Sequence, residues 1–108
     1  MDAIKTISTN AIYKLAGCED LPATRGEMMT DAGPIPIVET TWQLDEEERQ
    51  KFLETGIIHV RFVGNNIIPM YVSPFGAFEE FEQKLKDVPE FLKNYREHFG
   101  IPEEIVKE

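Results

Sequence analysis

The chain is poor in the residue types from which small catalytic and metal sites are built. Its 108 residues include one cysteine and two histidines. A single cysteine excludes an internal disulfide and gives no indication of an oxidising compartment. Neither His59 nor His98 has a second histidine or cysteine at the spacing of a metal site, so we expect no metal centre.

Long apolar runs and positive charge are also scarce. No run approaches the roughly 18 apolar residues of a membrane span, and the first residues lack the apolar core of a secretory signal. Lys and Arg number 11 against 20 Asp and Glu, which gives a net charge of −9 at pH 7. Because an acidic surface repels a phosphate backbone, we expect a cytoplasmic protein that binds neither membranes nor nucleic acid directly. The same charge is compatible with a basic protein partner.

Length and pattern predict one domain of the α+β class. A chain of 108 residues with 42% hydrophobic residues sustains a single core. Strand-like and helix-like patterns occupy separate stretches, which favours a small antiparallel sheet with helices packed on it. The strands are expected at about residues 10–15, 35–42, 57–63 and 67–72, the last two forming a hairpin.

A helix at about residues 45–55 is predicted from its two ends. Asp45 and Glu48 have the spacing of a capping box, and Gly56 supplies a left-handed exit. The acids Asp45 to Glu48 are therefore interpreted as caps rather than as a metal cluster, because successive helical positions do not converge on one ion.

Two further helices are predicted at about residues 76–86 and 88–99. Apolar residues recur there at steps of three and four, which places them on one stripe that has to be buried. Pro89 separates the helices, and Asp87 is the expected cap of the second. We expect both helices to cover the apolar face of the 57–72 hairpin. The stripe comprises Phe78, Phe81, Leu85, Val88, Leu92, Tyr95 and Phe99.

The stretch at about residues 16–36 is predicted to be a long irregular loop. Glycine and proline interrupt every periodic pattern in it, and loops of this length inside a domain are usually functional or disordered. It is therefore either a flexible connector or a binding loop. The interrupting residues are Gly17, Pro22, Gly26, Gly33, Pro34 and Pro36.

Around residues 41–73 the chain resembles small uncharacterised proteins encoded by phages and prophages. The resemblance is carried by Trp42, the acid-rich helix start at Asp45–Glu48, Gly56 and Pro69. It implies a bacterial or phage cytoplasmic setting and an accessory role, and it assigns no catalytic residue.

These observations favour a non-enzymatic acidic protein that acts by protein–protein interaction, as a phage accessory or host-interaction factor. One alternative is an inhibitor whose carboxylates imitate nucleic-acid phosphates in a basic groove of a host enzyme. Another is a small ligand-binding domain or enzyme that uses Cys18, Arg25 and His59, although no acid, base and nucleophile set converges. No catalytic, cofactor or metal residue is assigned.

A monomer is favoured over a homodimer, since Pro89 breaks the stripe that a coiled coil would need. The candidate partner-binding residues are exposed charges and methionines of the loop and of two helix starts. They are Arg25, Met28, Met29, Glu46, Glu47, Glu79 and Glu80.

Overall fold

The computed structural model describes residues 1–14, 16–61, 64–65 and 70–100. Antiparallel strands and three helices, two of them C-terminal, confirm the α+β class. In chain order the elements are β1 (Asp2–Ile4), β2 (Ala11–Tyr13), β3 (Leu21–Thr30), β4 (Gly33–Glu39), β5 (Thr41–Gln43), α1 (Glu46–Thr55), α2 (Glu79–Asp87) and α3 (Pro89–Phe99).

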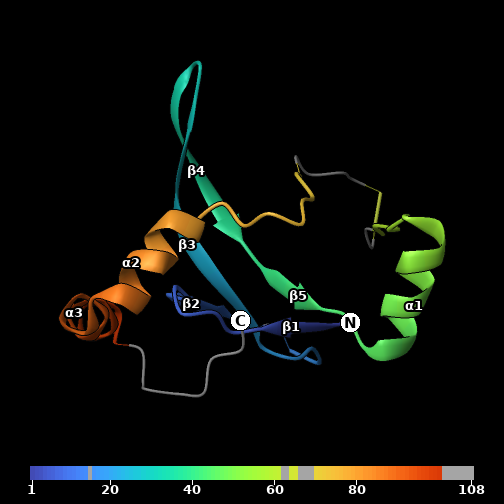
Figure 1. Cartoon of the computed structure of the whole chain (residues 1–108), viewed down its shortest axis with the longest axis horizontal. Coiled ribbons are helices and arrows are strands. Elements are labelled where there is room, and N and C mark those ends of the chain that lie inside the picture. The colour runs from blue at the N-terminus through green and yellow to red at the C-terminus, as the bar shows by residue number, and fades with distance from the viewer. Residues whose placement is uncertain (15, 62–63, 66–69, 101–108) are drawn as a thin grey trace.

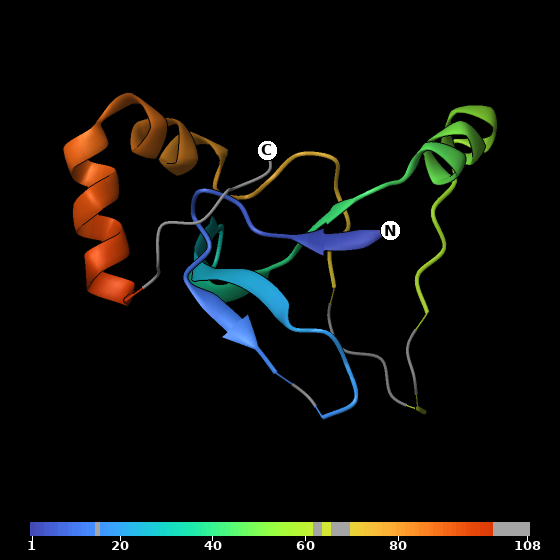
Figure 2. The ribbon, with the colours of Figure 1, turned by 90° about the horizontal axis from the view of Figure 1, so that it is seen from below.

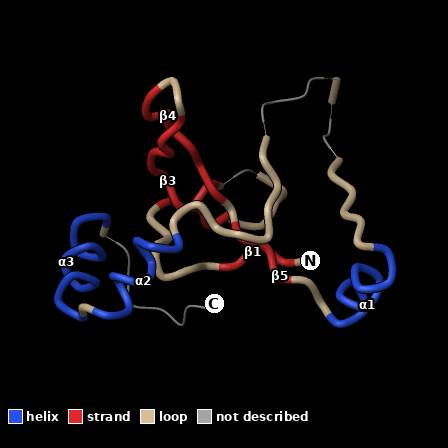
Figure 3. The backbone as a smooth tube through the Cα atoms, turned by 45° about the horizontal axis from the view of Figure 1, so that its top comes forward, coloured by secondary structure: helices blue, strands red, loops and turns tan. Residues whose placement is uncertain are grey.

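The strands form two small sheets, one of which contains the long hairpin of β3 and β4. β3 pairs with β2 at its inner end and with β4 along the rest of its length, and β1 pairs with β5. β4 and β5 follow each other with only Thr40 between them, so the second sheet continues from the first. We call residues 25–38 of the hairpin the arm. It projects away from the other elements (Figures 1 and 3).

Helix α1 forms as predicted from its two ends. The Asp45 side chain accepts from the Glu48 amide at 2.8 Å, and the Glu48 side chain accepts from the Asp45 amide at 3.0 Å. Gly56 ends the helix with φ 64°. The helix buries no residue, and it lies on the opposite side of the molecule from α2 and α3 (Figure 2).

Helices α2 and α3 are confirmed, with Pro89 at the start of α3 and Gly100 as a left-handed C-cap. The prediction that Asp87 caps α3 is wrong. Val88 is the N-cap and provides no side-chain bond, while Asp87 accepts a hydrogen bond from Gln83 within α2 at 2.9 Å. Asp87 is the last residue of α2, one position before the N-cap of α3, so it cannot cap α3.

The apolar core lies where the two C-terminal helices meet the base of the hairpin. Leu85 of α2 is fully buried, and so is Ala23 of β3. The ring of Phe81 meets Phe91 and Tyr95 edge to face, with centroids 5.8 and 5.1 Å apart. This geometry is the favourable one for aromatic pairs, so the helices pack on each other within one chain.

A buried polar junction attaches these helices to the strands. The Ser8 hydroxyl, 1% exposed, lies 2.9 Å from the Thr24 hydroxyl and donates to Glu82 Oε2 at 2.8 Å. The Ser8 carbonyl accepts a 2.6 Å hydrogen bond from the Tyr95 hydroxyl. Buried polar atoms must find partners, and among the described residues no buried side-chain N or O lacks one.

The prediction of a long loop at residues 16–36 is wrong, because β3 and β4 occupy most of it. Glycine and proline interrupt a strand pattern without preventing a strand when each sits at a tolerant position. Gly33 follows the turn with φ 106°. Gly26 lies under the ring of Phe78, where an added Cβ would be 2.6 Å from Cε1. The two prolines of β4 lie at its outer edge, where their missing N–H groups leave no bond to β3 unmade.

The strand predictions elsewhere divide into correct and incorrect ones. β2 lies within the expected 10–15, and β4 with β5 covers the expected 35–42. Residues 57–61 and 70–72 form no strand, and Ile57, Ile58 and Val60 are exposed. Apolar β-branched residues favour a strand only where a neighbouring strand and a buried face exist. The expected packing of the helices on this hairpin is also wrong, because α2 reaches β3 instead, through Phe78 over Gly26 and through Glu82, Ser8 and Thr24. Residues 62–63 and 66–69 of the expected hairpin lie outside the described ranges.

The chain is more open than a compact monomer of its size. Its accessible surface is 9135 Å², against about 6,100 Å² for a compact protein of this mass. Its radius of gyration is 15.6 Å, against about 13 Å for a domain of this length. The projecting arm and the separate helix α1 are parts of this open shape (Figure 1).

Gly26→Ala tests the contact between the arm and Phe78. The added methyl overlaps the Phe78 ring, and such overpacking costs about 1–3 kcal/mol of unfolding free energy. Phe78→Leu removes the obstructing ring, so the double variant should lose less than the two single variants together. Urea unfolding of all four proteins measures this coupling. Strictly additive losses would show that the two residues do not touch.

Tyr95→Phe tests the buried junction. Burial raises the pKa of Tyr95 above its ordinary value of 10, Glu82 adds to this, and a hydrogen bond with Asn10 opposes it. The native phenol therefore stays protonated where the unfolded chain ionises, and the stability it contributes is complete below pH 10 and lost as pH rises through the native pKa.

We expect Tyr95→Phe to lower the unfolding free energy by about 1–3 kcal/mol at pH 7, because the buried Ser8 carbonyl loses its donor. The difference from the parent protein should narrow as pH rises above 10. Urea unfolding at pH 7 and 11 measures both, and the remaining tyrosines are common to the two proteins. A difference that stays constant with pH would contradict the junction.

Candidate protein interface on the β3–β4 arm

The arm is a two-stranded ribbon with a fixed register. Thr30 pairs with Gly33 across the turn, and the pairing continues inward to Thr24 and Glu39. The Thr30 hydroxyl steadies the turn, because it donates to the Gly33 carbonyl at 2.7 Å and accepts from the Ala32 amide at 3.2 Å. Side chains alternate between the two faces of such a ribbon, so the register defines both faces.

The inner face of the arm is covered at its base. We define it by Gly26, Met28, Ile35 and Ile37. Phe78 lies against Gly26, and the Ala77 amide donates to Glu39 Oε2 at 2.7 Å. The segment before α2 therefore holds the base of this face, whereas Met28 and Ile35 near the tip are exposed.

The outer face of the arm is exposed along its whole length. It comprises Arg25, Glu27, Met29, Pro34, Pro36 and Val38. Met29 is 75% exposed and Val38 is 53% exposed. Four of the six residues are apolar, so this face is a narrow apolar strip with one positive and one negative charge near its base.

The two edges of the arm differ. Successive residues of an antiparallel strand turn their N–H and C=O groups alternately toward and away from the partner. The main chain of Arg25 bonds the Asn10 side chain, with N–H to Oδ1 at 2.7 Å and Nδ2 to C=O at 2.9 Å. Arg25 therefore faces away from β4, and so do Glu27 and Met29.

The β4 edge is blocked by proline. Pro36 pairs with Glu27 and Pro34 with Met29, so both proline nitrogens point away from β3. The prolines leave no donor missing inside the ribbon, and they remove donors from its outer edge, as edge strands often do. The β3 edge keeps its donors and acceptors. In the described part of the chain no strand pairs with β3 beyond Ala23 on this side.

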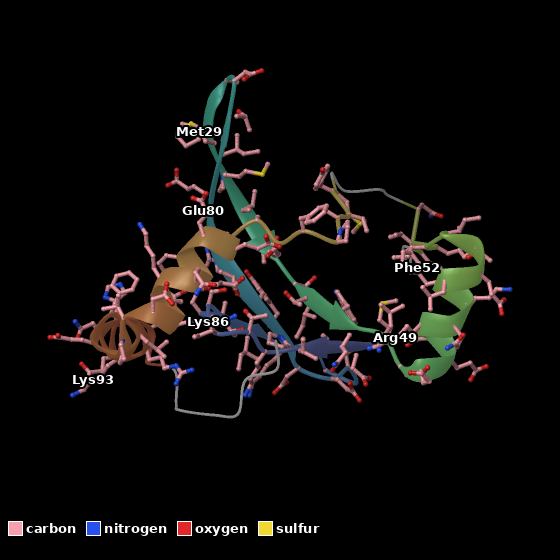
Figure 4. All side chains as sticks on the ribbon, viewed as in Figure 1. Met29, Arg49, Phe52, Glu80, Lys86 and Lys93 are labelled. Carbon is pink, nitrogen blue, oxygen red and sulfur yellow. The ribbon has the colours of Figure 1, made fainter. Side chains whose placement is uncertain are left out.

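The structure places the predicted partner-binding residues in three locations. Arg25, Met28 and Met29 lie on the arm. Glu79 and Glu80 lie in the first turn of α2 near the arm's base, and Glu46 and Glu47 lie in the first turn of α1 on the opposite side of the molecule. Figure 4 shows this separation through Met29, Glu80 and the α1 residue Phe52. The first two groups can share one surface, but the third cannot join them.

Individual roles also follow from the contacts. Glu79 accepts from the Gly76 amide at 2.8 Å, so it helps to begin α2. Glu48, which was not a candidate, forms an ion pair with the Met1 amine. Hydrogen bonds from the Asp45 amide and from this amine lower the pKa of Glu48.

The residues considered for chemistry do not form a site. Cys18 is exposed in the connection between β2 and β3, Arg25 is exposed on the arm, and His59 is exposed in the segment after α1. Within the described ranges no three His, Cys, Asp or Glu side chains are grouped so that they could hold a metal ion. Helices long and apolar enough to cross a membrane are likewise absent from those ranges.

Sequence reasoning missed Val38 and the two prolines of the outer face. The alternation of Ile35, Ile37 and Glu39 against Pro36 and Val38 could have indicated a two-faced edge strand, because proline is tolerated at an edge. The turn at Asp31-Ala32 was not predicted, because the surrounding stretch was interpreted as an irregular loop.

The chain matches no family model, and neither a curated protein nor a solved structure is similar to it.

Proposed function

We propose that this protein acts without catalysis, by binding another protein through the outer face of its arm. The observation that carries the proposal is the exposure of Met29, Pro34, Pro36 and Val38 on a ribbon that projects from the fold. Contiguous exposed apolar surface on a small protein marks an interaction site. The cytoplasmic phage or prophage setting implied by the resemblance fits an accessory factor of this kind.

The shape of the arm supports protein recognition. A ribbon of two strands is marginal alone in water, and it becomes stable when a further strand or a packed face is added. The segment around Phe78 holds only its base. A partner that covers the outer face would bury Met29 and Val38 and would order the outer half of the arm.

The alternative of a nucleic-acid mimic finds less support. A mimic needs carboxylates arrayed along one surface at the spacing of phosphates. Glu46 and Glu47 lie at the start of α1, and Glu79 and Glu80 lie at the start of α2, on opposite sides of the molecule. Glu79 accepts from the Gly76 amide and Glu46 from the Gln50 side chain, and acids in the first turn of a helix have an ordinary structural role because the unpaired amides there favour negative charge.

Val38→Asp tests the proposal, with Val72→Asp as the matched control. The two valines are 53% and 56% exposed, and Val72 lies outside the arm. A pull-down from the native host should recover a stoichiometric protein with the parent chain and with Val72→Asp, and should lose it with Val38→Asp. The charge would have to be buried against the partner's apolar surface, which is costly. Equal recovery by the two variants would refute the outer face, and a co-purifying small molecule would favour a ligand-binding domain.

The salt dependence of the same association separates the two kinds of surface. Raising the salt concentration from 0.05 to 0.5 M shortens the Debye length to below about 5 Å, so contacts between exposed charges weaken steeply. Binding through the apolar outer face should change less than about threefold over this range. A steep loss of affinity would favour the acidic surface and the mimic.

A further inference from the structure

We propose that two copies of this chain pair through the β3 edges of their arms, which forms a closed, four-stranded sheet in the order β4-β3-β3-β4. The inference concerns the arm's backbone edge. The inference rests on the proposed function and deepens it. In the dimer, the outer faces of the two arms lie side by side on one surface, so a partner can contact both.

The open edge supplies the bonds for this pairing. Glu27 and Met29 direct their N–H and C=O groups away from β4, as the bonds between Arg25 and Asn10 establish. The Asn10 side-chain amide bonds the main-chain N–H and C=O of Arg25, as a neighbouring strand would. Beyond it, the described residues contribute no strand to this edge. A strand of a second copy can continue the sheet in line with β2.

Charge selects one register for the pairing. Two-fold axes that preserve the hydrogen bonds pass through residue 27, 28 or 29. The axis at Glu27 opposes that residue to its own copy, and the axis at Met29 opposes Glu27 to Asp31. Like charges directly opposite destabilise a sheet. The axis at Met28 opposes Glu27 to Met29 twice and gives four inter-chain hydrogen bonds, so it is the favoured register.

The blocked edge explains why the assembly stops at two copies. Pro34 and Pro36 point their nitrogens outward from β4, so this edge has no donors at those positions. A sheet that can grow at both edges runs into a filament, whereas one open edge and one blocked edge close after a single two-fold pairing. Between residues 26 and 38 the only charged side chains are Glu27 and Asp31, so two acidic chains can approach here with little repulsion.

Pairing through the arm leaves the packing of the C-terminal helices unchanged. The sequence pattern favoured a monomer because the helical stripe makes a poor coiled-coil seam. The arm is a different surface, and the internal packing of Phe81 with Phe91 and Tyr95 does not oppose pairing through it.

A designed cross-link tests the register. Met28 would face its own copy across the axis as a non-hydrogen-bonded pair, whose Cα atoms lie about 4.5 Å apart, within disulfide range. Met28→Cys in a Cys18→Ser background should therefore convert almost completely to a disulfide-linked dimer on mild oxidation. Ile35→Cys in the same background is the matched control, because Ile35 lies opposite Met28 on β4 and is equally exposed. It should remain monomeric on a non-reducing gel.

Glu27→Pro provides a second test that needs no cross-link. It removes one outward N–H and leaves the bonds between β3 and β4 intact. Sedimentation equilibrium should give twice the chain mass for the parent protein and the single mass for Glu27→Pro, with unchanged circular dichroism. A monomeric parent, equal cross-linking of Met28→Cys and Ile35→Cys, or no cross-link at Met28→Cys would overturn the inference. None of these outcomes alters the Val38→Asp pull-down, which tests the outer face.

Discussion

Ser8 joins β3 to the two consecutive C-terminal helices, which are far from both in the sequence, and the position of the arm depends on this junction. The Ser8 hydroxyl joins Thr24 of β3 to Glu82 of α2, and its carbonyl accepts from Tyr95 of α3. The bond between Ser8 and Thr24 is buried and the other two are partly buried, and losing the partner of a buried polar group costs more than the bond itself contributes in water. Through these bonds the helices hold the base of β3, whereas Glu27 and Met29 farther along the strand are exposed.

For function, the consequence is that the base of the arm is held by the segment before α2, whereas its tip is exposed. Phe78 and Ala77 reach only as far as Gly26 and Glu39. Beyond these contacts the arm has two strands, one apolar outer face and one open edge. The outer face suits a protein partner and the edge suits another strand, so the same projection can take part in two different associations without competition between them.

Local signals in the sequence were sufficient for the helices and insufficient for the arm. The capping box at Asp45 and the spacing of the apolar stripe are contained in short stretches, and both predicted their helices correctly. The prediction that the whole stripe is buried is wrong, because Val88 and Phe99 are exposed. β3 and the first residues of β4 were missed because Gly26 and Pro34 are compatible with a strand only given Phe78 above the glycine and an outer edge on which the proline needs no N–H. Residues 57–61 show the reverse error, since their strand propensity meets no neighbouring strand. Met28 and Met29 are both exposed, but their placement on opposite faces follows only from the register of the strands.

Hydrogen exchange of the individual backbone amides along β3 tests the claim that the arm has one open edge. Gly26, Met28 and Thr30 face β4, so their amides should be protected at every protein concentration. Glu27 and Met29 should exchange rapidly in dilute solution and become protected together as concentration rises and the edges pair. We predict that exchange rates alternate along β3 in dilute solution and that this alternation disappears when the protein is concentrated. Protection of all five amides in dilute solution, or rapid exchange of Glu27 and Met29 at all concentrations, would contradict it.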